Sequence, residues 1–258
     1  MPGHGFALDL QAKGAIVIAS ALRQRHARTL VHGMINHRFD RPAPLLVEKF
    51  RGMWSSTLAD TMGRHGILGP DIQPIFQGIS LLGVAFTVQN YPNDNITTHR
   101  ALQLVQPGDV LVIDEGFGSA TGAFGHNMSL EARKRGVVGL VTNGHIRDVR
   151  MLREERFPIY CRGVSPRSAQ KNTPGSVNVP VQLGGTVVNP GDIVVGDDDG
   201  VAIVPRAMAE ALAAKAQARM EMEYQQARDI KAGERPLEIV FGKDWLATAL
   251  AGKVTENP

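Results

Sequence analysis

The sequence has very little cysteine, no long hydrophobic run and little net charge. Its one cysteine among 258 residues, Cys161, cannot form an internal disulfide, which is typical of a protein from a reducing compartment. Cys161 lies in the apolar run PIYCRG (158–163), which favours a thiol buried in a strand over a catalytic nucleophile. No apolar run reaches the ~20 residues that a membrane-spanning helix needs. We therefore expect a cytoplasmic protein that does not associate with membranes.

The small net charge, +3, does not predict binding to nucleic acid. Most of the excess lies in residues 1–45, where the charged residues are Lys13, Arg23, Arg25, Arg28, Arg38 and Arg41 against Asp9 and Asp40. The run GAIVIASAL (14–22) has the length of a signal-peptide core, but RQRHAR follows it directly, which favours a helix. We expect residues 1–45 to form a basic helical extension that packs between subunits.

Helical and extended patterns alternate through the middle of the chain. We expect helices at 8–31, 45–52, 55–66, 97–106, 127–135 and 206–231, and strands at 83–89, 107–116, 137–143 and 158–163. Ser55 or Ser56 is the expected N-cap of the helix at 55–66. The alternation predicts an α/β fold with a mixed sheet.

Short β segments separated by turns follow from residue 176. Asp199-Gly200 lies between two valine-rich runs, and this arrangement predicts a β-hairpin. Three consecutive carboxylates, Asp197, Asp198 and Asp199, could be read as a metal site. Their position directly before a strand favours a simple turn.

The segment NGHIRDV (143–149) follows the apolar run VVGLVT, at the end of a buried strand, where α/β proteins collect ligands. Arg147 offers a planar set of donors for a carboxylate or phosphate, and Asp148 offers a hard oxygen for Mg²⁺ or Mn²⁺. Adjacent residues on extended backbone point in opposite directions, so the two can reach one ligand only if the chain turns here. Taken alone, an Arg-Asp pair is explained more simply as a surface ion pair.

The segment GAFGHNM (122–128) is a glycine-flanked turn that leads into a helix. The free N–H groups at the start of such a helix can hold an anion. Together with Arg147 they would form a two-sided clamp for a carboxylate, with a metal site alongside.

Four stretches carry a resemblance to a known family: PGDVLVID (107–114), GHNM (125–128), GVVGLVTNGHIRD (136–148) and the β-rich run 174–205. In order and spacing they resemble the RraA-like family, which includes the 4-hydroxy-4-methyl-2-oxoglutarate (HMG/CHA) aldolases and the regulator of ribonuclease E activity. The resemblance covers residues 46–233, which we expect to be the catalytic domain. Residues 1–45 and the C-terminal tail, 234–258, fall outside it.

The resemblance implies a swivelling β/β/α domain that assembles as a trimer or a dimer of trimers, with active sites between subunits. It also implies a class II aldolase, which uses a divalent metal, Mg²⁺ or Mn²⁺, to cleave a 4-hydroxy-2-oxo acid and release pyruvate. Oxaloacetate decarboxylation passes through the same pyruvate enolate and is an expected second activity.

The family carries a D-x20-R-D signature, whose last two residues match Arg147 and Asp148. By this resemblance Arg147 holds the pyruvate portion together with the backbone at Gly125, Asn127 and Met128, and Asp148 binds the metal. The acidic first position falls on His126. A further acidic residue, donated by the C-terminal helix of a neighbouring subunit, matches Glu223.

The histidine at position 126 leaves several roles open. It could act as a base or proton shuttle near neutral pH, ligate a transition metal, or only cap the helix. The aldolase is accordingly one of three hypotheses. The others are a diverged enzyme that uses His126 on a different carboxylate or carbonyl substrate, and a non-catalytic protein that binds a ribonuclease.

Overall fold

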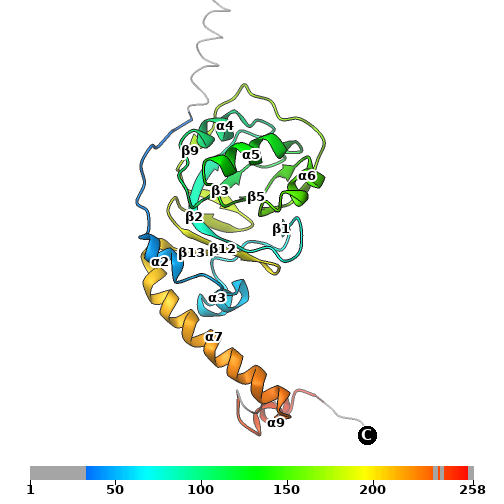
Figure 1. The fold of residues 1–258 in the computed structure, drawn as a ribbon. Helices are drawn as coiled ribbons and strands as arrows, with labels where there is room; N and C mark the ends of the chain where they lie inside the picture. Colours follow the sequence, from blue (N-terminus) through cyan, green and yellow to red (C-terminus); the bar gives the residue numbers. More distant parts are fainter. Residues whose placement is uncertain (1–32, 235–237, 239–240, 255–258) are drawn as a thin grey trace, which may run out of the picture.

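The computed structural model describes residues 33–234, 238 and 241–254, so the helix expected at 8–31 lies outside the described residues. Figure 1 shows a mixed α/β body from which one long helix, α7 (Ala209–Lys231), extends. The expected α/β class is confirmed. In the part of the chain that the structure describes, no helix is long and apolar enough to span a bilayer.

A central eight-stranded sheet organises this body. Its strand order is β1-β7-β5-β3-β2-β12-β13, and β9 also pairs with β2. The inner strands β2, β3, β5 and β7 are parallel, and the outer strands are antiparallel to their neighbours. The bounds are β1 (Gln73–Pro74), β2 (Leu81–Gln89), β3 (Asp109–Asp114), β5 (Gly139–Thr142), β7 (Ile159–Cys161), β9 (Ser176–Val177), β12 (Ile193–Asp197) and β13 (Gly200–Val204).

Layers cover both faces of this sheet, which explains why β3 and β5 are almost entirely buried. Helices α4 (Ile96–Leu102), α5 (His126–Lys134) and α6 (Val149–Glu154) cover one face, where they share a core with Leu111 and Leu140. The hairpin of β10 (Val181–Leu183) and β11 (Thr186–Val188) covers the other face, where Val110 and Val112 point. The alternation along β3 thus divides its side chains between two cores.

A third core joins the long helix to the body. It combines α3 (Ser55–Thr61) and the first half of α7 with β12 and β13, through buried residues such as Leu58, Leu212 and Ala216. A short 3₁₀ turn, η1 (Arg206–Met208), precedes α7, so the expected helix at 206–231 is confirmed. The remaining helices are α2 (Pro44–Glu48) and α9 (Trp245–Leu250).

The described part of the N-terminal extension, residues 33–43, is not helical. Ile35 forms a bridge with Val177 of β9, and Arg41 forms an ion pair with the fully buried carboxylate of Asp109. Partners on the sheet therefore hold residues 33–43 in a non-helical conformation. The helix of the expected extension, 8–31, lies outside the described residues, so that expectation stays a prediction. The boundaries expected at 45 and 233 stay predictions.

The three aspartates form a turn, as the sequence favoured. β12 and β13 pair with Asp197 opposite Gly200, so the hairpin is confirmed, and its turn is Asp198-Asp199 rather than Asp199-Gly200. The Asp198 carboxylate accepts the backbone N–H groups of Gly78 and Ile79. These aspartates therefore tie the hairpin to the body.

The prediction that Ser55 or Ser56 is an N-cap is wrong. Trp54 occupies the N-cap of α3, and Ser55 is the first helical residue. The carboxylate of Asp197 accepts both the N–H of Ser55, at 2.7 Å, and its hydroxyl, at 2.6 Å. A carboxylate that is distant in the chain thus accepts the N–H group at the start of α3, in place of the side chain of a local N-cap residue.

Cys161 is buried in β7, and burial raises the pKa of its thiol to about 11. This confirms the expected buried strand thiol, because such a group carries little thiolate at neutral pH.

Candidate functional site

A second, smaller sheet brings the two sequence motifs together. Its strands β4 (Gly122–Phe124), β6 (His145–Ile146) and β8 (Gly163–Val164) are parallel, in the order β4-β6-β8. The carboxyl ends of parallel strands lie at one edge of a sheet, so the residues that follow β4 and β6 become neighbours. These residues are Gly125, which leads into α5, and the pair Arg147-Asp148, which leads into α6.

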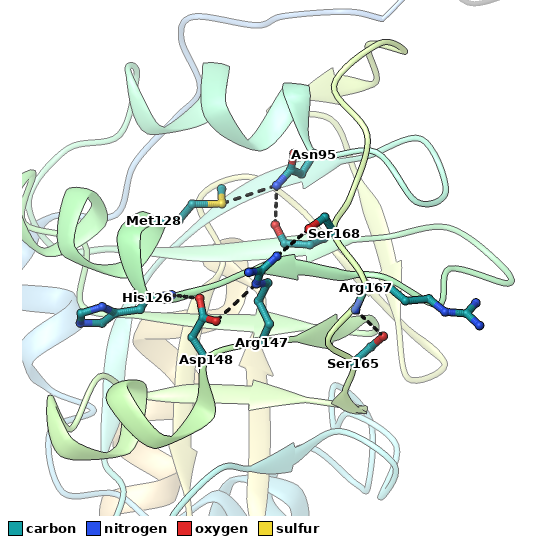
Figure 2. Close-up of polar contacts among 9 residues, drawn as sticks. Asn95, His126, Met128, Arg147, Asp148, Ser165, Arg167 and Ser168 are labelled. Atoms are coloured by element: carbon teal, nitrogen blue, oxygen red, sulfur yellow. Dashed lines mark hydrogen bonds and ion pairs between the residues drawn. The ribbon is translucent and has the colours of Figure 1, made fainter.

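The chain turns at Asp148. Such a turn is needed if the Arg147 and Asp148 side chains are to contact the same ligand. Asp148 has left-handed backbone angles, φ 60° and ψ 34°, and is the N-cap of α6. As a result the Arg147 and Asp148 side chains lie side by side, with 3.3 Å between Arg147 Nε and Asp148 Oδ1 (Figure 2). Non-glycine residues seldom adopt this conformation, and it recurs at ligand-binding sites.

Two glycines allow this pair to lie against β4. A Cβ atom at Gly125 would meet Asp148 Oδ2 at 2.6 Å and Arg147 Cγ at 2.9 Å. A Cβ atom at Gly122 would meet Arg147 Cβ at 2.9 Å and the carbonyl oxygen of Ser165 at 2.3 Å. The glycines of GAFGHNM therefore make room for Arg147 and Asp148.

His126 contacts Asp148 through its backbone and not through its ring. The His126 N–H donates to Asp148 Oδ2 at 3.1 Å. Figure 2 shows the imidazole ring pointing away from Asp148 and Arg147. Its Nε2 atom is buried without a hydrogen-bond partner and lies 4.0 Å from a carboxylate oxygen of Glu155.

A pocket of about 250 Å³ lies beside the Arg147-Asp148 pair. Its lining consists of Asn95, His99, Gly122, Ala123, Gly125, Asn127, Met128, Arg147, Asp148, Ser168, Ala169 and Lys171. The sequence-predicted residues Gly125, Asn127, Met128, Arg147 and Asp148 all belong to it, but His126 does not. The start of α5 therefore faces the same space as the Arg147-Asp148 pair, as the clamp requires.

The Arg147 guanidinium is held in place from the far side of the pocket. Its Nη1 donates to the Ser168 hydroxyl at 2.7 Å, which leaves its other N–H groups for the aspartate and a ligand. Asn95, which is buried, donates through Nδ2 to the Ala123 carbonyl oxygen at 2.6 Å and so fixes the wall beside β4.

Positive charge dominates the lining. Arg147 and Lys171 carry it, and Asp148 is the one carboxylate among the described residues of the lining. Burial and the neighbouring Lys171 lower the pKa of His99, which keeps this ring neutral at physiological pH. The charge balance suits an anionic ligand.

The donor set fits a hard cation that brings its own water or substrate ligands. Among the described residues of a single chain, no three His, Cys, Asp or Glu side chains converge as a metal cage. Mg²⁺ is commonly held by one or two carboxylates and completed by water and ligand oxygens, and Asp148 can serve as such a carboxylate. With its ring turned away, His126 does not add a nitrogen ligand in this conformation.

Glu223 lies elsewhere in this chain. It is on α7, where its two carboxylate oxygens accept from Thr57 Oγ1 at 2.7 Å and from Arg219 Nε at 2.8 Å. It is not part of the pocket lining. One chain therefore does not bring Glu223 to the site, and its expected role depends on a second copy.

The sequence reasoning did not identify Asn95, His99, Ser168 and Lys171, which also line the pocket. They come from α4 and from the segment after β8. No sequence motif connected either segment with the Arg147-Asp148 pair. Buried Asp94 joins these segments, because its Oδ2 accepts the N–H groups of Asn172 and Thr173.

Comparisons with known proteins show which family the chain belongs to. A family model described as Aldolase/RraA, of the RraA-like type, matches residues 55–203. The chain is similar to a Halalkalibacterium halodurans protein that carries the provisional name 4-hydroxy-4-methyl-2-oxoglutarate aldolase. The identity is 35% over 171 residues, which are 66% of this chain and 81% of that protein.

Two solved structures share the fold. Streptomyces coelicolor RraAS2, described as an unusual member of the RNase ES inhibitor RraA protein family, is 33% identical, with a TM-score of 0.66 over 73% of this chain and 100% of that chain. An uncharacterized protein from Pseudomonas syringae is 26% identical, with a TM-score of 0.71 over 78% of this chain and 95% of that chain. The chain belongs to the RraA-like family of aldolases and RraA proteins.

Proposed function

We propose that the protein is a divalent-metal-dependent carbon–carbon lyase that cleaves a 4-hydroxy-2-oxo acid to pyruvate and also decarboxylates oxaloacetate. The observation that carries the proposal is the convergence of the Arg147 guanidinium, the Asp148 carboxylate and the start of α5 on one pocket. The aldolase name of the Halalkalibacterium relative supports the same reaction class.

The chain's own residues bind and orient the pyruvate portion. Arg147 and the free backbone N–H groups of Asn127 and Met128 bind the carboxylate next to the oxo group. The Ser168 hydroxyl holds the guanidinium, so the substrate is bound in one orientation. Holding the substrate in one orientation accelerates the reaction, because the entropy cost of bringing the reacting groups into the productive geometry is met on binding.

Asp148 would hold the divalent metal, and a bound Mg²⁺ or Mn²⁺ supplies Lewis-acid stabilisation of negative charge on the oxo oxygen. In the cleavage a base removes the proton of the 4-hydroxyl group, the C3–C4 bond breaks, and C4 becomes a carbonyl carbon. The electron pair of that bond forms the pyruvate enolate, to which Arg147 lends positive charge. A proton then adds to C3 and gives pyruvate.

We propose that the acid and base come from outside the pocket lining of a single chain. His126 reaches the pocket only if its ring rotates from the position in Figure 2. Glu223 reaches a pocket only if it leaves Thr57 and Arg219 and α7 meets a second copy. We therefore propose a trimer or a dimer of trimers in which a neighbouring copy completes the site.

The experiment is pyruvate release by the purified protein, followed by coupling to lactate dehydrogenase. The substrates are 4-hydroxy-4-methyl-2-oxoglutarate and oxaloacetate, each with Mg²⁺, with Mn²⁺ and with chelator. The proposal predicts metal-dependent release that falls at least about 100-fold in Arg147→Ala, because an oxyanion donor is typically worth that factor. Metal binding without any pyruvate release from either substrate would reject this reaction.

A further inference from the structure

A second pocket, of about 360 Å³, lies at the carboxyl ends of the parallel strands β2 and β3. Its lining consists of Gly33, Gln89, Asn90, Tyr91, Pro92, Asp114, Gly116, Pro174, Gly175 and Ser176. It shares no residue with the lining of the pocket beside the Arg147-Asp148 pair. The carboxyl ends of parallel strands are where α/β sheets bind ligands, and the proposed reaction leaves this pocket unused.

The N-terminal segment builds one wall of this second pocket. A Cβ atom at Gly33 would meet the carbonyl oxygen of Gly175 at 1.7 Å, so the two backbones lie in direct contact. Next along the chain, the Met34 N–H donates to Ser176 Oγ at 3.1 Å, and the Met34 carbonyl oxygen accepts the N–H of Val177 at 2.8 Å. The family model begins to match at residue 55, so this wall lies outside the matched region.

Asp114 is the one charged side chain among the described residues of this lining. Its Oδ1 atom accepts the N–H of Gly116 at 2.9 Å and Nδ2 of Asn143 at 2.8 Å. Its Oδ2 atom accepts no hydrogen bond from the described residues and is not buried. One carboxylate oxygen therefore remains available to a ligand that donates hydrogen bonds.

The negative charge around Asp114 is not balanced by a paired cation. Among the described residues, no ion pair involves Asp114 or the nearby Asp94 and Glu115. Burial, opposed by the hydrogen bond from Asn90, raises the pKa of Glu115 to about 8, and the charges of Asp114 and Asp94 add to this shift. The three acidic groups thus act on one another, and the pocket favours a positively charged ligand.

The rest of the lining favours a planar cation. Tyr91, which is 47% exposed, offers an aromatic face, and the Gln89 side chain offers a neutral amide oxygen. A guanidinium group is weakly hydrated, stacks on aromatic faces and presents a planar set of N–H donors to a carboxylate, whereas an ammonium group is a strongly hydrated point charge. A metal is less well served, because no three His, Cys, Asp or Glu side chains converge in the part of the chain that the structure describes.

We propose that this pocket binds a guanidinium group between the Asp114 carboxylate and the face of Tyr91. The site is independent of the proposed lyase reaction, since the two pockets share no lining residue. The group can come from a small molecule or from the arginine side chain of a polypeptide, and the test separates these sources.

The test compares N-butylguanidinium with N-butylurea, which has the same shape but an oxygen atom in place of one NH₂ group and no charge. NMR titration of the wild-type protein should show about tenfold tighter binding of butylguanidinium, the usual effect of a charge-assisted hydrogen bond. In Asp114→Asn, which keeps an acceptor for Gly116 and Asn143, that ratio should fall to within about twofold. Tyr91→Leu should weaken butylguanidinium binding about two- to fivefold.

Two further aspartate-to-asparagine variants are the matched controls. Asp199→Asn removes the same charge from the β12–β13 turn, which lies at the other end of β2 from Gln89. Asp148→Asn removes it from the candidate active site. Both should keep the wild-type ratio. A wild-type ratio in Asp114→Asn, or its loss in Asp148→Asn, would overturn the proposal.

The tripeptide acetyl-Gly-Arg-Gly-amide identifies the source of the guanidinium group. If it binds at least as tightly as butylguanidinium, and through Asp114, the pocket takes an arginine side chain of a polypeptide. If it binds more than about tenfold more weakly, the pocket takes a small molecule. Absence of binding of both butylguanidinium and the tripeptide to the wild-type protein would reject the site.

Discussion

His126 and Asp148 meet through a backbone N–H and a carboxylate, 3.1 Å apart, while the imidazole ring points out of the pocket. The position where the family's signature has an acidic side chain therefore contributes a main-chain donor here. This donor and Arg147 Nε each contact one oxygen of Asp148. The two contacts orient the carboxylate that we assign to the metal.

The first prediction separates the backbone of His126 from its ring. His126→Ala keeps the N–H and should lower kcat less than about tenfold, well below the 10²–10⁴ expected on removal of a general base. His126→Pro removes the N–H at a helical position that tolerates proline and should weaken Mg²⁺ binding, measured by calorimetry, more than the alanine variant does. A loss of about 1000-fold in His126→Ala, together with a missing limb of the pH–rate profile, would instead identify the ring as the base.

The second prediction concerns Gly125. In Gly125→Ala the new Cβ would lie 2.6 Å from Asp148 Oδ2, so the carboxylate and Arg147 must move. The backbone angle φ, −143°, is one that alanine adopts freely, so the free energy of unfolding should change by less than about 1 kcal/mol. We expect kcat/KM to fall at least about 100-fold with little change in Tm. Full activity in this variant would show that the close approach at Gly125 has no catalytic importance.

The third prediction concerns stability and pH. Burial raises the pKa of Glu115 from 4.5 to about 8; the Asn90 hydrogen bond opposes the shift, and Asp114 and Asp94 add to it. A raised carboxyl pKa means that the folded state keeps a proton that the unfolded state has lost. The contribution of Glu115 to the free energy of unfolding should therefore be fully present below pH 4.5 and be lost as the pH rises from 4.5 to about 8.

Glu115→Gln removes this ionisation, so the free energy of unfolding should depend less on pH between 4.5 and about 8. Relative to wild type, the variant should gain roughly 1–3 kcal/mol at pH 8.5 and much less at pH 4.5, as measured by urea unfolding at both pH values. The same difference between wild type and variant at both pH values would contradict the buried, protonated carboxyl.

The fourth prediction tests the cap on α3. Asp197→Ala removes the acceptor of both the Ser55 N–H and its hydroxyl, and should destabilise the protein by about 1–3 kcal/mol. Asp199→Ala is the control, since this exposed turn residue contributes no side-chain acceptor to α3. Thermal unfolding of the two variants gives the comparison, and equal Tm values would contradict the capping role.

The sequence predicted the local features of the site more successfully than its long-range contacts. The sequence predicted GAFGHNM as a turn that leads into a helix and Arg147-Asp148 as the end of a strand. Residues 122–124 are instead the strand β4, and the structure brings the two segments together because β4 and β6 are parallel. The His126 ring lies 4.0 Å from Glu155, at the end of α6, and no local pattern at residue 126 indicates this neighbour.

The residues that the sequence reasoning missed depend on contacts between distant segments. Asp94 fixes the backbone beside Lys171 from 78 and 79 positions away in the chain, and Asp197 caps α3 from 142 positions away. Lysine and aspartate in polar segments are common on any surface, so their types alone do not reveal such contacts.

The central claim is that Arg147 and Asp148 stabilise the enolate of pyruvate, and proton exchange tests it most directly. The measurement is loss of the pyruvate methyl signal by NMR in D₂O, with Mg²⁺ and the wild-type protein, Arg147→Ala or Asp148→Asn. We predict metal-dependent exchange by the wild-type protein and a rate at least about 100-fold lower in each variant. Absence of exchange from a wild-type protein that binds both Mg²⁺ and pyruvate would contradict the account.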